Sequence, residues 1–284
     1  MMKSANNKWL WWLVARNKCC IRCQKGITHH KNERSNHNVW IERRLYALLC
    51  SACMTKIPWI TTVQCLRCGR AQVCQDCHYR KTRSLRYNRS AVRYTDEMKQ
   101  WLSTYKFQGD ARYRELLTYM LSHVYDQVTL QLVRDQGLYE HWQQSHLTIR
   151  IYAKRYKLWQ VVTSVPISEE RILERGFNQA QQLALGVAEY GELPYIELLR
   201  RDRDSVKLSS KNKRERENSV QQLYASEASY WLPLMRVWKT APLINILLVD
   251  DVYTTGSTIE ACSSAIISHA PSPIAIYSLT WARA

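Results

Sequence analysis

Four pairs of cysteines with C-x-x-C spacing could hold metal: Cys20/Cys23, Cys50/Cys53, Cys65/Cys68 and Cys74/Cys77. A two-residue gap folds the backbone into a knuckle whose two thiolates reach one tetrahedral ion, at about 2.3 Å per Zn–S bond. Two knuckles complete a four-thiolate site without an open position, so its role is structural. The eight ligands predict two Zn²⁺ ions, and the spacing leaves the pairing of the knuckles open. Eight free cysteines would not need such regular pairing in one segment.

A second pattern, INILLVDDVYTTGST, spans residues 244–258. An apolar strand is followed by two carboxylates, a hydroxyl-rich loop and a helix. Hydroxyls and backbone N–H groups at a helix N-terminus favour an anion, and glycine lets the backbone approach it closely. Two carboxylates would repel a phosphate but suit sugar hydroxyls beside Mg²⁺. The pattern therefore predicts a phosphoribosyl ligand held by Asp250, Asp251, Thr254, Thr255, Gly256, Ser257 and Thr258. An ordinary strand-to-helix turn would need only one such capping residue.

Two basic segments could contact the same ligand. Arg171 and Arg175 lie four residues apart and could clamp a pyrophosphate, or they could be solvent-facing loop charges. The run Lys207–Arg216 is polar and basic, so a lid over an anionic ligand and a solvated helix face are equally compatible with it.

The elements that must position these residues alternate between strands and helices. Apolar runs predict strands, and 3.6-residue periodicity predicts helices. We expect helices over 96–105, 111–133, 178–190 and 259–269, and strands over 160–165, 244–249 and 274–279. This alternation predicts an α/β domain with a mostly parallel sheet over residues 94–284. In such sheets, ligands bind at the carboxyl ends of the strands.

Charge divides the 284-residue chain, whose formal net charge is +17. Residues 1–93 hold 19 lysines and arginines against three acids, whereas residues 94–284 hold 22 against 21. We therefore expect a basic zinc module with an N-terminal extension at 1–93. Its arginines alternate with tyrosines over Tyr79–Tyr94, a composition typical of single-stranded DNA binding. A solvated basic face or a patch for an acidic protein would have the same composition.

Other classes are disfavoured. The longest apolar run, Trp9–Ala15, is far shorter than the roughly 20 residues that a membrane span needs, and no cleavage site of a signal peptide follows it. We interpret it as a short buried or partner-binding helix. Cysteines in regular pairs within one segment argue against a secreted disulfide protein. These features predict a cytoplasmic protein with reduced thiols.

Taken together, the motifs resemble the competence protein F family (ComFC) in its Gram-positive form, over roughly residues 18–283. VDDVYTTGST resembles the phosphoribosyl pyrophosphate (PRPP) loop of type I phosphoribosyltransferases, a loop that many nucleotide-synthesis enzymes share. The order of the motifs makes the resemblance specific: Cys65–Arg70, Asn88–Ser90, Lys106–Asp110, Val165–Ser168, Arg175–Gln179 and then the loop.

The resemblance implies a type I phosphoribosyltransferase-like sheet that binds PRPP with Mg²⁺. Residues 250, 251 and 254–258 would hold the ribose 5-phosphate part, and Arg175 with Arg171 would lie near the pyrophosphate. It also implies a role in the uptake of single-stranded DNA during natural transformation, beside the competence helicase ComFA and, through partners, at the inner face of the membrane. It implies no acceptor substrate. An active phosphoribosyltransferase and an adaptor that docks a helicase remain alternatives.

Overall fold

The computed structural model describes residues 19–27, 39–72, 74–79, 84–108, 111–201, 223–232 and 243–284. The chain divides into two compact units, Met1–Ile57 and Pro58–Ala284. Sequence patterns placed a boundary at residue 93 instead. The two divisions differ because residues 58–93 pack with the larger unit, where Tyr87–Arg93 forms a strand of the central sheet.

The first unit contains two short helices, α1 (Val39–Leu48) and α2 (Ser51–Met54). A tight turn precedes them, in which the N–H of Cys20 donates to the carbonyl of Lys25 at 2.8 Å. The N–H of Ile21 donates to the carbonyl of Leu48 at 3.0 Å, so the turn lies beside the end of α1. This contact brings together two cysteine pairs that are far apart in sequence.

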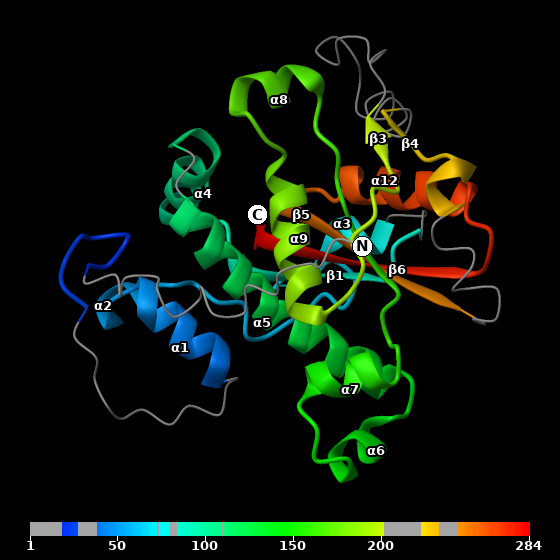
Figure 1. Ribbon diagram of the computed structural model, residues 1–284, viewed down its shortest axis with the longest axis horizontal. Helices are drawn as coiled ribbons and strands as arrows, with labels where there is room; N and C mark the ends of the chain where they lie inside the picture. The colour runs from blue at the N-terminus through cyan, green and yellow to red at the C-terminus, as the bar shows by residue number, and fades with distance from the viewer. Residues whose placement is uncertain are drawn as a thin grey trace, which may run out of the picture. The chain divides into compact units, whose positions relative to one another are not determined.

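The larger unit is built on a four-stranded parallel sheet in the order β1-β6-β5-β2 (Figure 1). Its strands are β1 (Tyr87–Arg93), β2 (Val161–Ser164), β5 (Ile244–Tyr253) and β6 (Ile274–Arg283). A small antiparallel pair joins β3 (Arg200–Arg201) to β4 (Tyr224–Ala225). The helices are α3 (Gln75–Tyr79), α4 (Asp96–Gln108), α5 (Ala111–Asp135), α6 (Tyr139–Gln144), α7 (Ile149–Arg155), α8 (Glu169–Arg175), α9 (Gln179–Gly191), the 3₁₀ helix η3 (Ala228–Trp231) and α12 (Ser257–Ser268).

Helices cover both faces of the sheet, because its strands are apolar on both sides. Along β5, the side chains of Ile244, Ile246 and Leu248 pack in a buried cluster with residues of α12, and alternate residues face the other way. Helices α5 and α9 pack against each other; α5 contacts β1 and β6, and α9 contacts β5 and β2. Helix α8, by contrast, has no buried residue and projects away from the sheet (Figure 1).

The structure confirms the α/β class, the parallel sheet and the flanking helices. Differences lie at the ends of elements. Strand β5 continues to Tyr253 instead of ending before Asp250, and α12 begins at Ser257 instead of Ile259. Strand β1 was not expected, because its sequence YNRSAVR is polar and basic. Among the described residues, none of the helices combines the length and hydropathy that crossing a bilayer requires.

One expectation about the basic segment Tyr79–Tyr94 needs correction at Arg89. This arginine is only 6% exposed, and its guanidinium donates to Gln131 Oε1 and to the carbonyl of Leu66. Tyr87 is buried as well, whereas Arg86 and Arg93 are exposed. Arg89 and Tyr87 therefore stabilise β1 and are not available to DNA. Residues 80–83 of the segment lie outside the described residues, as do Trp9–Ala15.

Candidate functional site

The loop between β5 and α12 has the geometry of an anion-binding turn. Gly256 lies in the left-handed region at φ +83°, and a Cβ there would meet the hydroxyl oxygen of Tyr253 at 2.0 Å. Glycine is therefore required both by the turn and by the tyrosine ring against it. Thr254 and Thr255 are exposed, and Thr255 Oγ1 accepts from the N–H of Ser257, the first residue of α12, at 3.4 Å. The N–H groups of the next two residues, Thr258 and Ile259, belong to the same first turn of the helix, where an anion is favoured.

The two carboxylates lie within β5, immediately before this loop. The N–H of Asp251 donates to Asp250 Oδ1 at 2.8 Å. Burial raises the pKa of Asp250 well above its usual range, and the neighbouring charge of Asp251 raises it further. Lys106, from α4, forms an ion pair with Asp251 in which both side chains are less than one-fifth exposed. The ammonium of Lys106 thus offsets part of the negative charge of this carboxylate pair.

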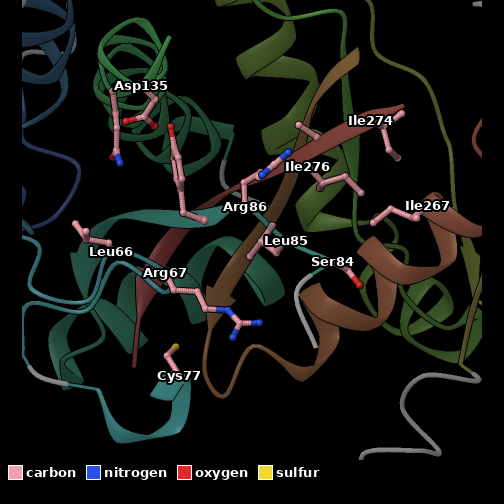
Figure 2. A pocket seen from close by; sticks show the side chains of 13 residues that line it. Leu66, Arg67, Cys77, Ser84, Leu85, Arg86, Asp135, Ile267, Ile274 and Ile276 are labelled. Atoms are coloured by element: carbon pink, nitrogen blue, oxygen red, sulfur yellow. The ribbon is translucent and has the colours of Figure 1, made fainter. Parts of the chain in front are cut away.

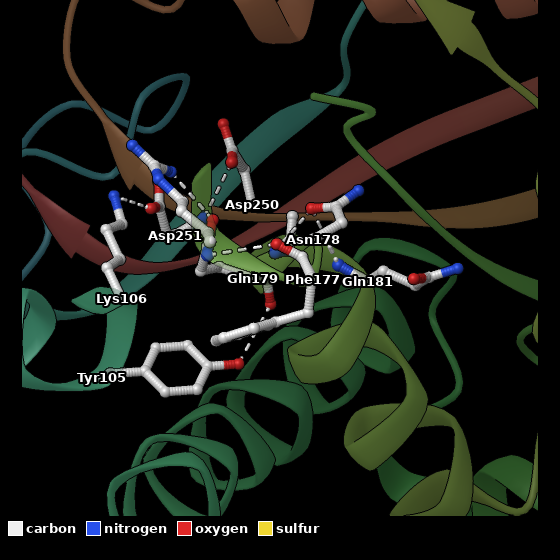
Figure 3. A network of polar contacts seen from close by, with 10 residues as sticks. Tyr105, Lys106, Phe177, Asn178, Gln179, Gln181, Asp250 and Asp251 are labelled. Atoms are coloured by element: carbon white, nitrogen blue, oxygen red, sulfur yellow. Dashed lines mark hydrogen bonds and ion pairs between the residues drawn. The ribbon is translucent and has the colours of Figure 1, made fainter. Parts of the chain in front are cut away.

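The end of α4 also reaches the second predicted constellation. The hydroxyl of Tyr105 donates to the carbonyl of Gln179 at 3.4 Å, and the guanidinium of Arg175 lies 5.5 Å from the ring centre of Phe107. Arg175 Nη1 in turn donates to Gln179 Oε1 at 2.9 Å. Figure 3 shows the labelled residues of α4, of the start of α9 and of β5 converging on one region.

Asn178 fixes the start of α9 in this network. Its Oδ1 accepts from the N–H groups of Ala180 and Gln181, and its Nδ2 donates to the carbonyl of Val165 at 3.1 Å (Figure 3). The side chain thereby caps the helix and ties it to the end of β2. The segment Arg175–Gln179 is therefore anchored to the carboxyl edge of the sheet.

The two predicted arginines, Arg171 and Arg175, differ in burial and in their contacts. Arg175 is half-buried, and its buried Nε has no hydrogen-bond partner among the described residues. Arg171 is exposed on α8, one turn earlier. Arg175 thus joins the network of Tyr105, Phe107 and Gln179, whereas no contact of Arg171 with that network is seen in the described part of the chain. The run Lys207–Arg216 lies outside the described residues.

The eight paired cysteines form two clusters, Cys20, Cys23, Cys50 and Cys53 in the first unit and Cys65, Cys68, Cys74 and Cys77 in the larger one. Within each cluster the four sulfurs lie within 4.8 Å of one another. Four thiolates around one Zn²⁺ lie about 3.8 Å apart, as follows from the Zn–S distance and tetrahedral angles. Both clusters could therefore hold zinc. The pairing left open by the sequence is resolved, because each cluster combines consecutive knuckles.

Each cluster contains a thiol with a lowered pKa. Burial raises the pKa of Cys20, but hydrogen bonds from the backbone of Cys23 and Cys50 outweigh it and bring the pKa to about 7. Burial likewise raises the pKa of Cys68, and Arg283 outweighs it, again to about 7. Burial and the neighbouring thiols raise the pKa of Cys53 in the first cluster and of Cys77 in the second above the ordinary value. The thiolate is the form that ligates a metal, so all four thiols of a cluster ionise together only when a cation offsets their charges.

A separate pocket of about 700 Å³ lies at the amino ends of β1 and β6 (Figure 2). Its wall is apolar at Leu85, Ile274 and Ile276, and carries Arg86 and Asp135. Because the sheet is parallel, this pocket is at the opposite edge from the β5–α12 loop. Cys77 is the one predicted site residue in its lining.

Sequence reasoning assigned no role to Lys106, Tyr105 or Gln179. Lys106 and Gln179 lie in motifs that supported the family resemblance, and that signal could have drawn attention to them. Tyr105 appeared only as an apolar position of a helix. Nothing in the periodicity of residues 96–108 indicates that this helix ends at the carboxyl edge of the sheet.

No family model matches the chain. Two curated proteins, both named Competence protein ComFC, are similar to it. The protein from Bacillus subtilis (strain 168) is 32% identical over 228 residues, which cover 77% of this chain and 78% of that protein. The protein from Streptococcus pneumoniae (strain ATCC BAA-255 / R6) is 29% identical over 216 residues, which cover 75% of this chain and 78% of that protein.

Proposed function

The chain belongs to the ComFC family of competence proteins, and from this membership we propose that it binds PRPP with Mg²⁺ and acts in the uptake of single-stranded DNA. The competence-related role follows from the family. The ligand and the nucleic acid are proposals that rest on the site and on the distribution of charge.

One observation carries the PRPP proposal. The start of α12, the Asp250–Asp251 pair and the half-buried Arg175 lie at the carboxyl edge of the sheet. The helix start favours a phosphate, and the carboxylates can accept hydrogen bonds from the hydroxyls of a ribose. The arginine can pair with a pyrophosphate. PRPP carries a phosphate, a ribose and a pyrophosphate in one molecule.

In this proposal the loop N–H groups and the hydroxyls of Thr254, Thr255, Ser257 and Thr258 bind the 5-phosphate. Asp250 and Asp251 accept hydrogen bonds from the ribose hydroxyls. Arg175 contacts the pyrophosphate, and Arg171 approaches it from α8. Carboxylate oxygens are also ligands that Mg²⁺ accepts, and a divalent cation would offset the repulsion that raises the pKa of Asp250.

A calorimetric titration of the full chain with PRPP and Mg²⁺ tests the proposal. We expect saturable binding by the parent protein and at least tenfold weaker binding by Asp251→Asn. Asp135→Asn, the same substitution outside the site, is the matched control and should bind like the parent. Absence of binding by the parent would refute the proposal. Pyrophosphate release in the presence of purine or pyrimidine bases would add transferase activity to it.

The proposal of single-stranded DNA binding rests on the basic first 93 residues and on exposed cations of the first unit. Lys25, Arg43 and Lys56 are exposed there. Lysines and arginines that contact phosphates release counterions, so the logarithm of the affinity falls with the logarithm of the salt concentration. This slope distinguishes an electrostatic interface from an apolar one.

Fluorescence anisotropy with a labelled oligothymidine tests this second proposal. The double variant Lys25→Glu/Arg43→Glu should bind more weakly than the parent and with a shallower salt slope. Arg155→Glu, an equally exposed site on α7 of the larger unit, is the control and should change the affinity less. Binding that is equal at 50 and 300 mM salt would contradict the electrostatic interface.

The competence helicase ComFA remains a proposed partner on the strength of the family resemblance alone. Co-elution of the two purified proteins in size-exclusion chromatography tests it. If they co-elute and the chain binds neither PRPP nor DNA, the adaptor alternative is favoured.

A further inference from the structure

Arg283, at the end of β6, joins the second cysteine cluster to the start of the β5–α12 loop. Its side chain is buried, with 5% of the residue exposed. Nη2 lies 3.5 Å from Cys68 Sγ, while Nη1 donates to the carbonyls of Tyr253 at 3.0 Å and Thr254 at 2.8 Å. One planar guanidinium therefore contacts a cysteine of the cluster and two consecutive carbonyls that open the loop.

These two hydrogen bonds help to orient the donors of the loop, beside the backbone hydrogen bond in which the N–H of Ala284 donates to the carbonyl of Tyr253 at 3.0 Å. The described backbone has no cis peptide bond, and across a trans peptide a carbonyl and the next N–H point in opposite directions. Because Arg283 holds the carbonyls of Tyr253 and Thr254, the N–H groups of Thr254 and Thr255 face away from it. The guanidinium also lies 4.8 Å from the centre of the Tyr253 ring, on which Gly256 rests.

A second arginine from the same cluster supports the other end of the loop. Arg67, between Cys65 and Cys68, forms a salt bridge of 2.7 Å with Glu260, whose side chain is 7% exposed. Glu260 lies in the first turn of α12 and also accepts from the N–H of Ser84 at 3.2 Å. Left unpaired, this carboxylate would repel an anion at the helix N-terminus. Figure 2 shows Arg67 extending from the knuckle.

We propose that the cluster of Cys65, Cys68, Cys74 and Cys77, with its metal, positions the β5–α12 loop for a phosphorylated ligand through Arg283 and Arg67. This inference rests on the proposed PRPP site and gives one cluster a role in ligand affinity. The cluster of the first unit has no part in it. Arg283 and Arg67 are positioning residues, because they contact the loop and not the ligand.

Charge supports this arrangement. A buried cation is costly unless an anion compensates it, and four thiolates around Zn²⁺ carry a net charge of −2. The metal-bound cluster would thus supply the negative charge that holds Arg283 in place. Loss of the metal would reduce that charge and weaken the hold on the guanidinium, because Cys68 alone keeps part of its thiolate character beside Arg283.

Arginine variants of the full chain test the positioning by titration with PRPP and Mg²⁺. We expect Arg283→Met to raise the Kd at least tenfold, which corresponds to about 1.4 kcal/mol. Arg283→Lys should fall between this variant and the parent, because an ammonium keeps the charge but cannot contact two carbonyls and a sulfur in one plane. Arg86→Met, at an exposed arginine on the opposite edge of the sheet, should bind like the parent.

Hydrogen exchange, measured without and with PRPP, provides a readout that a general loss of stability would not reproduce. In Arg283→Met the amides of Thr254 and Thr255 should lose the exchange protection that PRPP gives the parent, while amides of β5 before Asp250 keep their rates. If Arg283→Met folds, retains zinc and binds PRPP like the parent, the inference is wrong. If the parent itself does not bind PRPP, the proposed function is refuted, and the inference that rests on it is refuted with it.

A matched pair of cysteine variants tests the metal. Cys77→Ser and Cys23→Ser each remove one ligand, from the second and the first cluster respectively, and zinc content is measured alongside the Kd. We expect each to lose one zinc ion and only Cys77→Ser to bind PRPP more weakly. An equal loss of affinity in both variants, or in neither, would overturn the coupling. Arg283→Met provides the decisive comparison if Cys77→Ser does not fold.

Discussion

Replacing Lys106 by methionine should destabilise the ligand-free protein, because it leaves Asp251 without a cation beside Asp250. Breaking a fully buried ion pair costs about 3–5 kcal/mol, and an exposed pair contributes about 0–1 kcal/mol. The side chains of Lys106 and Asp251 are 18% and 17% exposed, so the pair lies between these limits. We expect a loss of about 2 kcal/mol, which for a domain of this size lowers Tm by about 4–8 °C.

Urea unfolding of a double-mutant cycle measures this interaction. Asp251→Asn alone removes the repulsion with Asp250 as well as the pair, so it should cost less than Lys106→Met. In the double variant Lys106→Met/Asp251→Asn most of the loss should be recovered, since no unpaired carboxylate remains. Strictly additive effects of the two substitutions would refute the reasoning, because they would show that Lys106 and Asp251 are not coupled. Lys99→Met, whose lysine pairs with exposed Asp96 on the same helix, is the matched control.

Three further predictions concern the same edge of the sheet. Because the pKa of Asp250 is raised in the folded protein, stability falls as pH rises from its ordinary value near 3.8 through the raised value. Asp250→Asn should flatten this fall in urea unfolding at several pH values and weaken PRPP binding; an unchanged pH profile would contradict it. Gly256→Ala should cost more stability than Gly137→Ala, because both glycines have positive φ but only the first Cβ would clash; equal Tm losses would exclude the contact with Tyr253. Arg175→Met should weaken PRPP binding more than Arg171→Met, and the reverse order in titration would contradict the placement of Arg175.

Local patterns were sufficient for the fold class but not for the edge of the sheet. The strands that sequence reasoning identified, β2, β5 and β6, are apolar and bounded by turns, so burial alone defines them. Strand β1 is polar. Its buried Asn88 donates to nearby Ser90, but it also depends on distant groups, because it donates to the carbonyl of Cys68 and accepts from Ser278. Such partners are not visible in a local window, which is why the segment was interpreted as a basic surface.

In the candidate site, too, local sequence patterns predicted some residues, whereas others depend on distant parts of the chain. The loop that follows Asp251 could be predicted, because glycine, hydroxyls and carboxylates occur together in one short segment. Its supporting residues Lys106 and Arg283 could not, because they come from two parts of the chain that are far from the loop in sequence. The nine predicted ligand residues, 250, 251, 254–258, 171 and 175, remain predictions until a ligand is tested. For the cysteines, spacing predicted the ligands, and only the three-dimensional structure could pair them.

The position of β1 beside β6 has a consequence for synthesis on the ribosome. Ser90 Oγ and Thr280 Oγ1 form a 2.6 Å hydrogen bond across the two strands, although they lie 190 residues apart in sequence. At about 5–20 residues per second, β6 is translated roughly 10–40 s after β1. During that interval β1 has no β6 to pair with, and Cys68 of the neighbouring cluster lacks its contact with Arg283. The nascent chain therefore lacks the strand that pairs with β1, and the arginine that contacts Cys68, until residues 274–283 have been translated.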